Sequence, residues 1–171
     1  MMRRQKGSIH NKSGIESIRN AEASISRYCA YQERTVNQVN EKLKSMNISE
    51  EDSGTIISKL ISEGFINEQR FAIAYTLGKL NQNKWGRLKI SHNLKAHGIS
   101  GEHIEYAFSQ YGEDRYRELA FRLIGKKLRE IKDKDPHIIK QKAAKYMIVK
   151  GFESNIVWAI LNDKTRDHFK L

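Results

Sequence analysis

The sequence is poor in cysteine, in proline and in long apolar runs. Cys29 is the only cysteine, so no disulfide can form within the chain and a reducing compartment is expected. No run approaches the ~18 consecutive apolar residues of a membrane-spanning helix, and residues 1–20 lack the apolar stretch of a secretory signal. These absences predict a cytoplasmic protein. With Pro136 as the only proline, long helices joined by short turns are expected.

Positive charge is what the sequence has in excess. The chain has 171 residues and a formal net charge of +11, with 39% hydrophobic residues. That apolar fraction suits a series of small helical modules better than one large core. The charge favours nucleic acid as a partner, and an acidic protein or a membrane surface is the second choice. The alternative is that the charge only keeps the surface solvated and has no partner.

Three segments of the chain repeat one pattern. Their apolar anchors are Leu43, Leu94 and Met147, which are 51 and 53 residues apart. The same offsets align a second apolar position (Val39, Ile90 and Ala143) and a third (Ile48, Ile99 and Phe152). A constant period of this length is typical of helical repeat proteins.

The residues after each anchor predict where helices end and begin. Gly98 and Gly151 stand where a helix should stop, since glycine adopts the left-handed conformation without steric cost. Asn47 takes that place in the first repeat, and asparagine is also tolerant of it. Ser49 and Ser100 are expected to cap the helices that follow.

We therefore predict an all-α fold of three tandem three-helix repeats in an elongated array, straight or curved. Its expected parts are a flexible basic tail at 1–20, repeats at 21–69, 70–112 and 113–162, and a C-terminal tail at 163–171. Within the third repeat, Asp135 and Pro136 are expected as the N-cap and first residue of its middle helix.

Two stretches carry a resemblance to a known family. One runs from Leu60 to Ala72 and includes Gly64-Phe65-Ile66-Asn67 and Arg70-Phe71-Ala72. The other is Lys84-Trp85-Gly86-Arg87, followed by Ile90, Leu94, Gly98 and Ile99. With the three-repeat layout, the chain resembles the RecX family of RecA-recombinase regulators over residues from about 22 to 161. The Lys84-Trp85-Gly86 turn departs from the Gly-Pro more usual in the family.

The resemblance implies an activity that the composition alone does not. Proteins of this family bind along the groove of the RecA filament on single-stranded DNA and dampen ATP hydrolysis and strand exchange. The resemblance thus implies a role in DNA recombination, DNA repair and the SOS response, with RecA and single-stranded DNA as partners and duplex DNA as a further ligand. A monomer is expected.

The charge is unevenly distributed among the repeats. Residues 1–20 carry +4 and residues 21–69 carry −3, whereas residues 70–112 carry +4, residues 113–162 carry +5 and residues 163–171 carry +1. Matching positions change in the same way: Val36 corresponds to Arg87 and Lys140, and Gln38 corresponds to Lys89 and Lys142. One surface is therefore expected to be basic in two repeats of three.

A second row of basic residues is expected on one helix face, at Arg122, Lys126, Arg129 and Lys132, because the steps of four, three and three residues match helical spacing. The candidate DNA- or filament-binding residues are Lys84, Trp85, Arg87, Lys89, Arg122, Lys126, Arg129, Lys140, Lys142 and Lys145. The alternative is that these charges form a solvated helix face.

Trp85 lies between two of these basic residues and has two interpretations. An exposed indole could stack on a base or anchor a protein contact. Packing between the helices of the second repeat is the interpretation that the sequence favours.

The sequence contains no recognisable catalytic motif. A phosphate-binding glycine loop, a His-Glu-x-x-His pair and a Cys-x-x-Cys pair are all missing, so no metal, cofactor or enzymatic activity is expected. The leading function is regulation of a RecA–DNA filament. The alternatives are a DNA-binding protein that acts independently of recombinase and a helical scaffold for an acidic protein partner.

Overall fold

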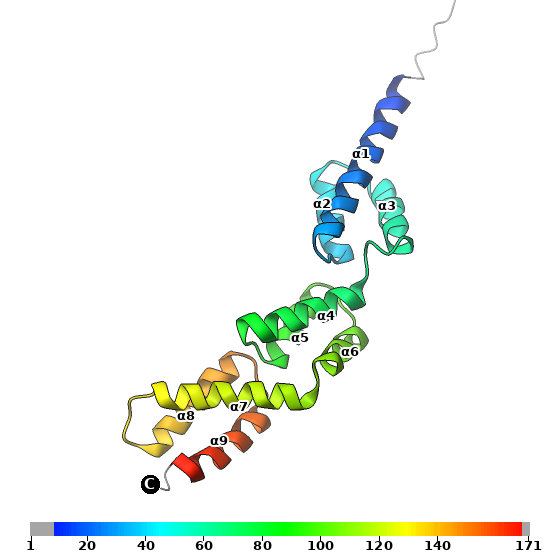
Figure 1. The fold of residues 1–171 in the computed structure, drawn as a ribbon. Helices are drawn as coiled ribbons and strands as arrows, with labels where there is room; N and C mark the ends of the chain where they lie inside the picture. Colours follow the sequence, from blue (N-terminus) through cyan, green and yellow to red (C-terminus); the bar gives the residue numbers. More distant parts are fainter. Residues whose placement is uncertain (1–8, 169–171) are drawn as a thin grey trace, which may run out of the picture. The chain divides into compact units, whose positions relative to one another are not determined.

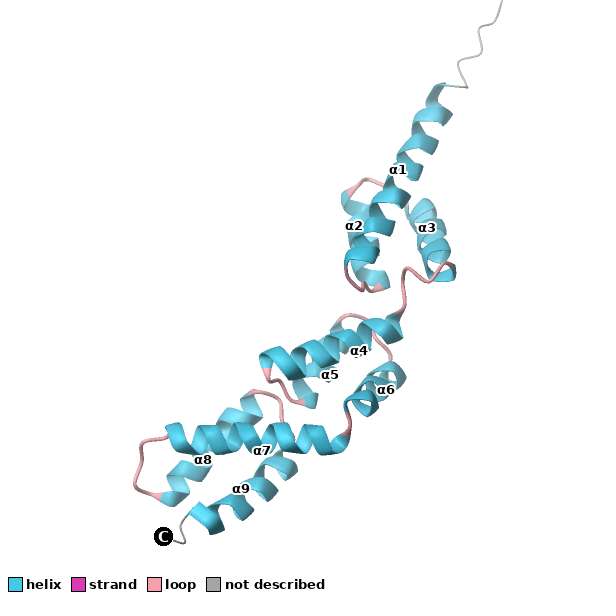
Figure 2. Ribbon diagram, in the orientation of Figure 1, coloured by secondary structure: helices cyan, strands magenta, loops and turns pink. Residues whose placement is uncertain are grey.

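A computed structural model describes residues 9–168, and the side chains of residues 14–163. These residues form nine α-helices and one π-helical turn, without a strand among them. The chain divides into two compact units after Phe71. Figure 1 identifies the helices, and Figure 2 shows that most are joined by short loops. The predicted all-α fold of three three-helix repeats is confirmed.

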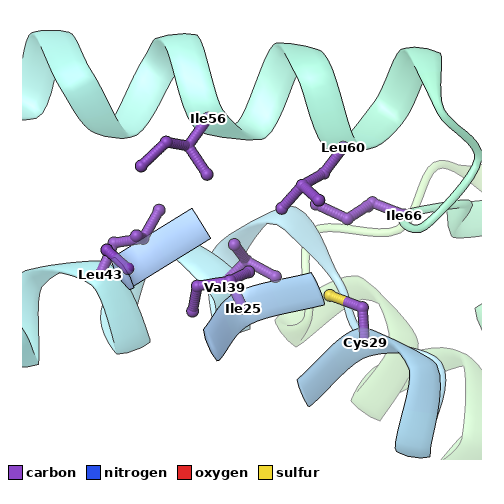
Figure 3. Close-up of a cluster of buried hydrophobic side chains, with 8 residues drawn as sticks. Ile25, Cys29, Val39, Leu43, Ile56, Leu60 and Ile66 are labelled. Carbon is purple, nitrogen blue, oxygen red and sulfur yellow. The ribbon is translucent and has the colours of Figure 1, made fainter. Parts of the chain in front are cut away.

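The first unit contains the first repeat. Its helices are α1 (Ile9–Tyr31), α2 (Val36–Ser45) and α3 (Glu50–Ser62). Each helix contributes one apolar face to a common core, as helical amphipathicity requires. Figure 3 shows side chains of α3 opposite those of α1 and α2. The buried core residues are Ala21, Ile25, Cys29, Val39, Leu43, Ile56, Leu60 and Ile66.

The segment from Gly64 to Ala72, which carries the family resemblance, connects the first repeat to the second. Gly64 ends α3 with a φ of +76°, and Ile66 then packs into the first core. The guanidinium of Arg70 donates to both carboxylate oxygens of Glu33, at 2.8 and 3.3 Å, and to the carbonyl of Gly64 at 2.8 Å. These contacts hold the connecting segment against the first repeat.

The second unit contains the helices of the other two repeats, apart from the first turn of α4. The second repeat is formed by α4 (Glu68–Gly78), the π-helical turn η1 (Lys79–Asn83), α5 (Arg87–Ala96) and α6 (Gly101–Tyr111). The third repeat is formed by α7 (Glu113–Glu130), α8 (Pro136–Val149) and α9 (Ser154–His168). The three helices of the third repeat pack on one another.

The repeat spacing is visible in the helices themselves. The middle helices α2, α5 and α8 end at Ser45, Ala96 and Val149, at the offsets of the sequence pattern. The anchors Leu43, Leu94 and Met147 are completely buried. Asn47, Gly98 and Gly151 all have positive φ, between 57° and 88°. The predicted helix ends are therefore confirmed.

The predicted caps are confirmed in the same way. The side chains of Ser49 and Ser100 accept from the backbone N–H groups of Asp52 and His103, respectively. Asp135 accepts from the N–H of His137, with Pro136 as the first helical residue. Each cap satisfies a donor that would otherwise be unpaired at the start of a helix.

Three predicted boundaries need correction. Helix α1 begins at Ile9, so residues 9–20 are helical and not a flexible tail; residues 1–8 lie outside the described part. This stretch has little apolar patterning, but extending a helix that is already packed costs little compared with nucleating one. Likewise α9 continues to His168, into the predicted C-terminal tail, and α4 begins at Glu68, two residues before the predicted start of the second repeat.

Candidate nucleic-acid interface

A groove of about 500 Å³ lies between the second and third repeats. We call it the lysine groove, because four of its seven residues are lysines. Trp85, in the turn before α5, and Lys89, on α5, form one side. The other side is formed by residues at the C-terminal half of α8. The complete lining is Trp85, Lys89, Lys142, Lys145, Tyr146, Val149 and Lys150.

The sequence of α8 explains why its groove residues share a face. Lys142, Lys145, Tyr146 and Val149 follow one another at steps of three, one and three residues, which is the spacing of one helical stripe. Lys150 continues this stripe just beyond the helix. The opposite stripe is apolar and buried, with Ile139, Ala143, Ala144 and Met147 at most 8% exposed. Core packing of that stripe therefore turns the lysines outward.

The turn that presents Trp85 has an unusual backbone. The π-helical turn is followed by Lys84, whose φ of 56° lies in the left-handed region. The N–H of Trp85 donates to the carbonyl of Lys79 at 3.1 Å, and the ammonium of Lys150 donates to the carbonyl of Asn83 at 3.3 Å. Such π-helical turns are frequent at functional sites. Here the turn places a half-buried indole at the edge of the groove.

Two backbone hydrogen bonds hold the two sides of the groove together. The N–H of Gly86 donates to the carbonyl of Lys150 at 2.8 Å, and the N–H of Leu88 donates to that of Gly151 at 3.0 Å. A Cβ at Gly86 would lie 2.2 Å from the backbone of Gly151. Only glycine permits this approach, so the two repeats are joined at the groove by main-chain contact.

A buried tyrosine strengthens the same junction. The hydroxyl of Tyr116 accepts from the N–H of Arg87 at 3.1 Å and donates to the carboxylate of Glu153. Its ring stacks on that of Phe152, with 5.3 Å between the centroids. Burial, followed by the hydrogen bond to Glu153, raises the pKa of Tyr116 well above its ordinary value. The hydroxyl therefore stays protonated and keeps donating.

Arg87 is engaged inside the protein. Its guanidinium lies 2.8 Å from Glu113 and 3.9 Å from Glu153, and 4.0 Å from the centre of the Tyr116 ring. The hydrogen bond from Arg87 lowers the pKa of Glu113. A lowered pKa means that the stabilisation is complete above the ordinary pKa of a glutamate and is lost as the pH falls through the lowered value.

The lysines of the groove have few acidic neighbours. Lys142 pairs with Asp133 at 2.7 Å, and this hydrogen bond lowers the pKa of Asp133. Within the described part of the chain, Lys89, Lys145 and Lys150 have no carboxylate within salt-bridge distance. Like charges gathered in this way repel one another, and an anionic ligand would relieve the repulsion.

The structure brings four of the ten candidate residues together in the groove: Trp85, Lys89, Lys142 and Lys145. The ammonium of Lys84 donates to the carbonyl of Asn81. Lys140 lies on α8 and is not part of the lining. Trp85 is half-buried and lines the groove, so part of its indole packs against the protein and part is accessible from the groove.

Arg122, Lys126 and Arg129 are exposed on α7 and are not part of the groove lining. Arg122 pairs with Glu118 at 3.7 Å and Lys126 pairs with Glu130 at 3.9 Å. The expected fourth member of this row, Lys132, lies beyond the last residue of α7. The row is therefore shorter than predicted, and its own helix partly neutralises it.

Tyr146, Val149 and Lys150 line the groove but were missed by the sequence comparison. That comparison looked for positions that are basic in both the second and the third repeat, and none of these three positions is: Tyr146 matches Asn93, Val149 matches Ala96 and Lys150 matches His97. The helical stripe that begins at Lys142 would have identified them, because every member lies three or four residues from another.

Other kinds of site are not seen in the described part of the chain. No three or more His, Cys, Asp or Glu side chains gather there as metal ligands would. None of the helices in that part combines the length and the apolar character needed to cross a bilayer.

The fold and the groove define a class of protein: an array of three-helix repeats with a lysine-rich groove between its second and third repeats. Two family models match the chain, the second three-helix domain of RecX over residues 67–107 and the third over residues 113–161. The chain belongs to the RecX family.

Individual relatives agree with this assignment. The Regulatory protein RecX of Bacillus cytotoxicus is 28% identical over 148 residues, which is 86% of this chain and 55% of that protein. That of Bacillus pumilus is 32% identical over 76% of this chain and 49% of its own length. This chain thus spans about half the length of these relatives. The crystal structure of RecX from Lactobacillus salivarius matches with a TM-score of 0.80 and 27% identity, over 87% of this chain and 97% of that one.

Proposed function

We propose that this protein regulates a RecA recombinase by binding the filament that RecA forms on single-stranded DNA, and that it dampens ATP hydrolysis and strand exchange there. The lysine groove is the observation that carries the proposal. It gathers four lysines on a surface built jointly by the two basic repeats. Lysine side chains bind nucleic acids by neutralising their phosphate groups and releasing the counterions around them. The family membership supplies the recombinase as the partner.

The junction between the repeats explains how such a surface could act on a filament. Gly86, Gly151 and Tyr116 connect the second and third repeats through backbone and side-chain hydrogen bonds. A binding surface that is rigid before binding loses less conformational freedom on association. We propose that the mode of action is binding and not catalysis, with the acidic first repeat facing the recombinase or the solvent.

The test is the rate of ATP hydrolysis by RecA on single-stranded DNA while this protein is titrated in. We expect the rate to fall as the protein approaches the amount needed to occupy the filament. A rate that is unchanged at both substoichiometric and stoichiometric amounts would contradict the proposal. If the protein instead bound DNA equally well without RecA and had no effect on hydrolysis, it would be a recombinase-independent DNA-binding protein.

A further inference from the structure

We propose that the lysine groove is a nucleotide subsite. It takes one nucleotide at a time, with the base against the rings of Trp85 and Tyr146 and the flanking phosphates on the lysines. This inference rests on the proposed function and gives its surface a ligand chemistry: unpaired nucleotides, read by stacking as well as by charge.

The first support is the position of the lysine side chains relative to the aromatic rings. The ammonium groups of Lys79 and Lys89 lie 4.9 and 4.4 Å from the centre of the Trp85 ring. Those of Lys127 and Lys150 lie 4.9 and 5.4 Å from the centre of the Tyr146 ring. Each ring of the groove therefore holds two cations.

These contacts can be exchanged for contacts with a nucleotide. A cation over a half-buried ring and a base stacked on an aromatic side chain are held with comparable strength, so the gain from the exchange comes from the phosphate. When a base stacks on Trp85 or Tyr146, the displaced ammonium can pair with the adjacent phosphate. Lysine suits this exchange because its charge stands on a long, flexible chain.

The lining of the groove also matches a nucleotide. Trp85, Tyr146 and Val149 supply flat and apolar surface, with Val149 68% exposed, and the lysines supply positive charge. A volume of about 500 Å³ lies within the range of sites for small ligands. An acidic peptide would neutralise the lysines but would make no use of the aromatic rings. A nucleotide has both a ring and an anion and uses both parts of the lining.

The bases must be unpaired to reach the groove. In a duplex the faces of the bases are stacked on one another, so an aromatic side chain can reach them only where the strand is single. The subsite therefore predicts a preference for single strands that does not depend on base sequence. The unit can belong to a DNA strand or to a free nucleoside phosphate, and the experiment separates these sources.

The experiment uses the fluorescence of Trp85 in the full chain. The chain has two tryptophans, Trp85 and Trp158, so the variant Trp158→Phe leaves Trp85 as the only indole. This variant is titrated with oligothymidylate, with an abasic strand of equal length and charge, with thymidine monophosphate and with oligo-glutamate. Circular dichroism checks that the helical content is unchanged.

We expect oligothymidylate to quench Trp85 and to bind about tenfold more tightly than the abasic strand, which is the range for one stacked base. Quenching by thymidine monophosphate at similar affinity would support the subsite and assign it to free nucleotides. Equal binding and equal quenching by the normal and abasic strands would overturn the inference, as would equal quenching by oligo-glutamate.

A second variant tests the other ring. Tyr146→Leu keeps an apolar side chain and removes the ring, so it should lower the affinity for oligothymidylate about tenfold and leave that for the abasic strand unchanged. The matched control is Tyr106→Leu on α6, where the tyrosine is 44% exposed and outside the groove. Equal losses in the two variants would also contradict the subsite.

These results are separable from the proposed function. If the normal and abasic strands bind equally while RecA hydrolysis still falls, the subsite fails and the regulatory function stands. If stacking is seen but RecA hydrolysis is unaffected, the subsite stands and the regulatory function fails.

Discussion

At the scale of single residues, Tyr116 links the second and third repeats. Tyr116 lies on α7. Its hydroxyl accepts a hydrogen bond from the backbone N–H of Arg87, at the start of α5, and donates one to the carboxylate of Glu153, just before α9. Because this site is buried, water cannot easily take the place of the hydroxyl as the hydrogen-bond partner of Arg87 and Glu153. An unsatisfied buried group costs more than the net value of the hydrogen bond that it has lost.

Replacing Tyr116 with Phe removes only this hydroxyl. The N–H of Arg87 and the carboxylate of Glu153 each lose the hydrogen bond that they made with it. We expect the free energy of unfolding, measured with urea, to fall by about 1–3 kcal/mol. The control is Tyr106→Phe, at a tyrosine that is 44% exposed, which should change it by less than about 0.5 kcal/mol. A loss no larger in Tyr116→Phe than in the control would contradict the role assigned to the hydroxyl.

Single residues also show where sequence reasoning reached its limit. The matching of Val36, Arg87 and Lys140 placed three residues in equivalent helices, at the first residue of α2 and of α5 and at the fifth residue of α8. It could not show that Arg87 is held by Glu113 and Glu153, because Glu113 belongs to the next repeat and Glu153 to the last turn before α9. Such pairings depend on how the repeats dock, and repeat spacing contains no information about docking.

At the scale of helices and turns, two glycines fix the groove. Gly86 precedes α5 and Gly151 follows α8, and their backbones meet where α5 begins and α8 ends. Gly151 also has a φ of +88°, and a Cβ there would lie 2.4 Å from the Cβ of Lys89. Neither position can accept a side chain without moving one side of the groove.

The variant Gly86→Ala should therefore separate the helix ends and destabilise the fold, by about 1–3 kcal/mol as for an overpacked core. Its matched control is Gly101→Ala, in the first turn of α6, where an added Cβ meets nothing within 4 Å. Thermal unfolding of both variants checks the expectation. If Gly86→Ala were as stable as Gly101→Ala, the close backbone contact would not exist as described.

Helix ends were the most predictable elements of this fold. The glycine and asparagine positions, the serine caps and the Asp135-Pro136 start were all identified from local chemistry, and the structure confirms them. The N-terminal half of α1 was not identified. Its residues carry no apolar stripe, and it is helical as a continuation of the packed segment around Ala21 and Ile25. Local patterns mark the ends of helices more reliably than their extensions.

At the scale of the whole chain, charge is separated along the sequence. The first repeat, residues 21–69, carries −3, whereas residues 70–162 carry +9. Within the second unit, part of that excess is gathered in the lysine groove and part is neutralised along α7. For the proposed function we therefore expect attraction to DNA to depend on where the charge lies as well as on its total. The sequence alone indicated the basic repeats, but the groove required the packing of α8 against the turn at Trp85.

The central claim is that the lysine groove binds the filament, and equilibrium binding to RecA filaments on single-stranded DNA tests it most directly. The groove variant carries Lys89→Glu and Lys145→Glu. The control carries Lys42→Glu and Lys44→Glu on α2, in the acidic repeat, and therefore has the same net charge as the groove variant. Both are compared with the unchanged protein at one salt concentration, because contacts with phosphates weaken as salt increases.

We predict that the groove variant binds the filament at least about tenfold more weakly than the unchanged protein, since two phosphate contacts become repulsive. The control should change the affinity by less than about twofold, because its lysines lie outside the groove. Equal weakening in both variants would show that net charge alone governs binding, and undiminished binding of the groove variant would contradict the account.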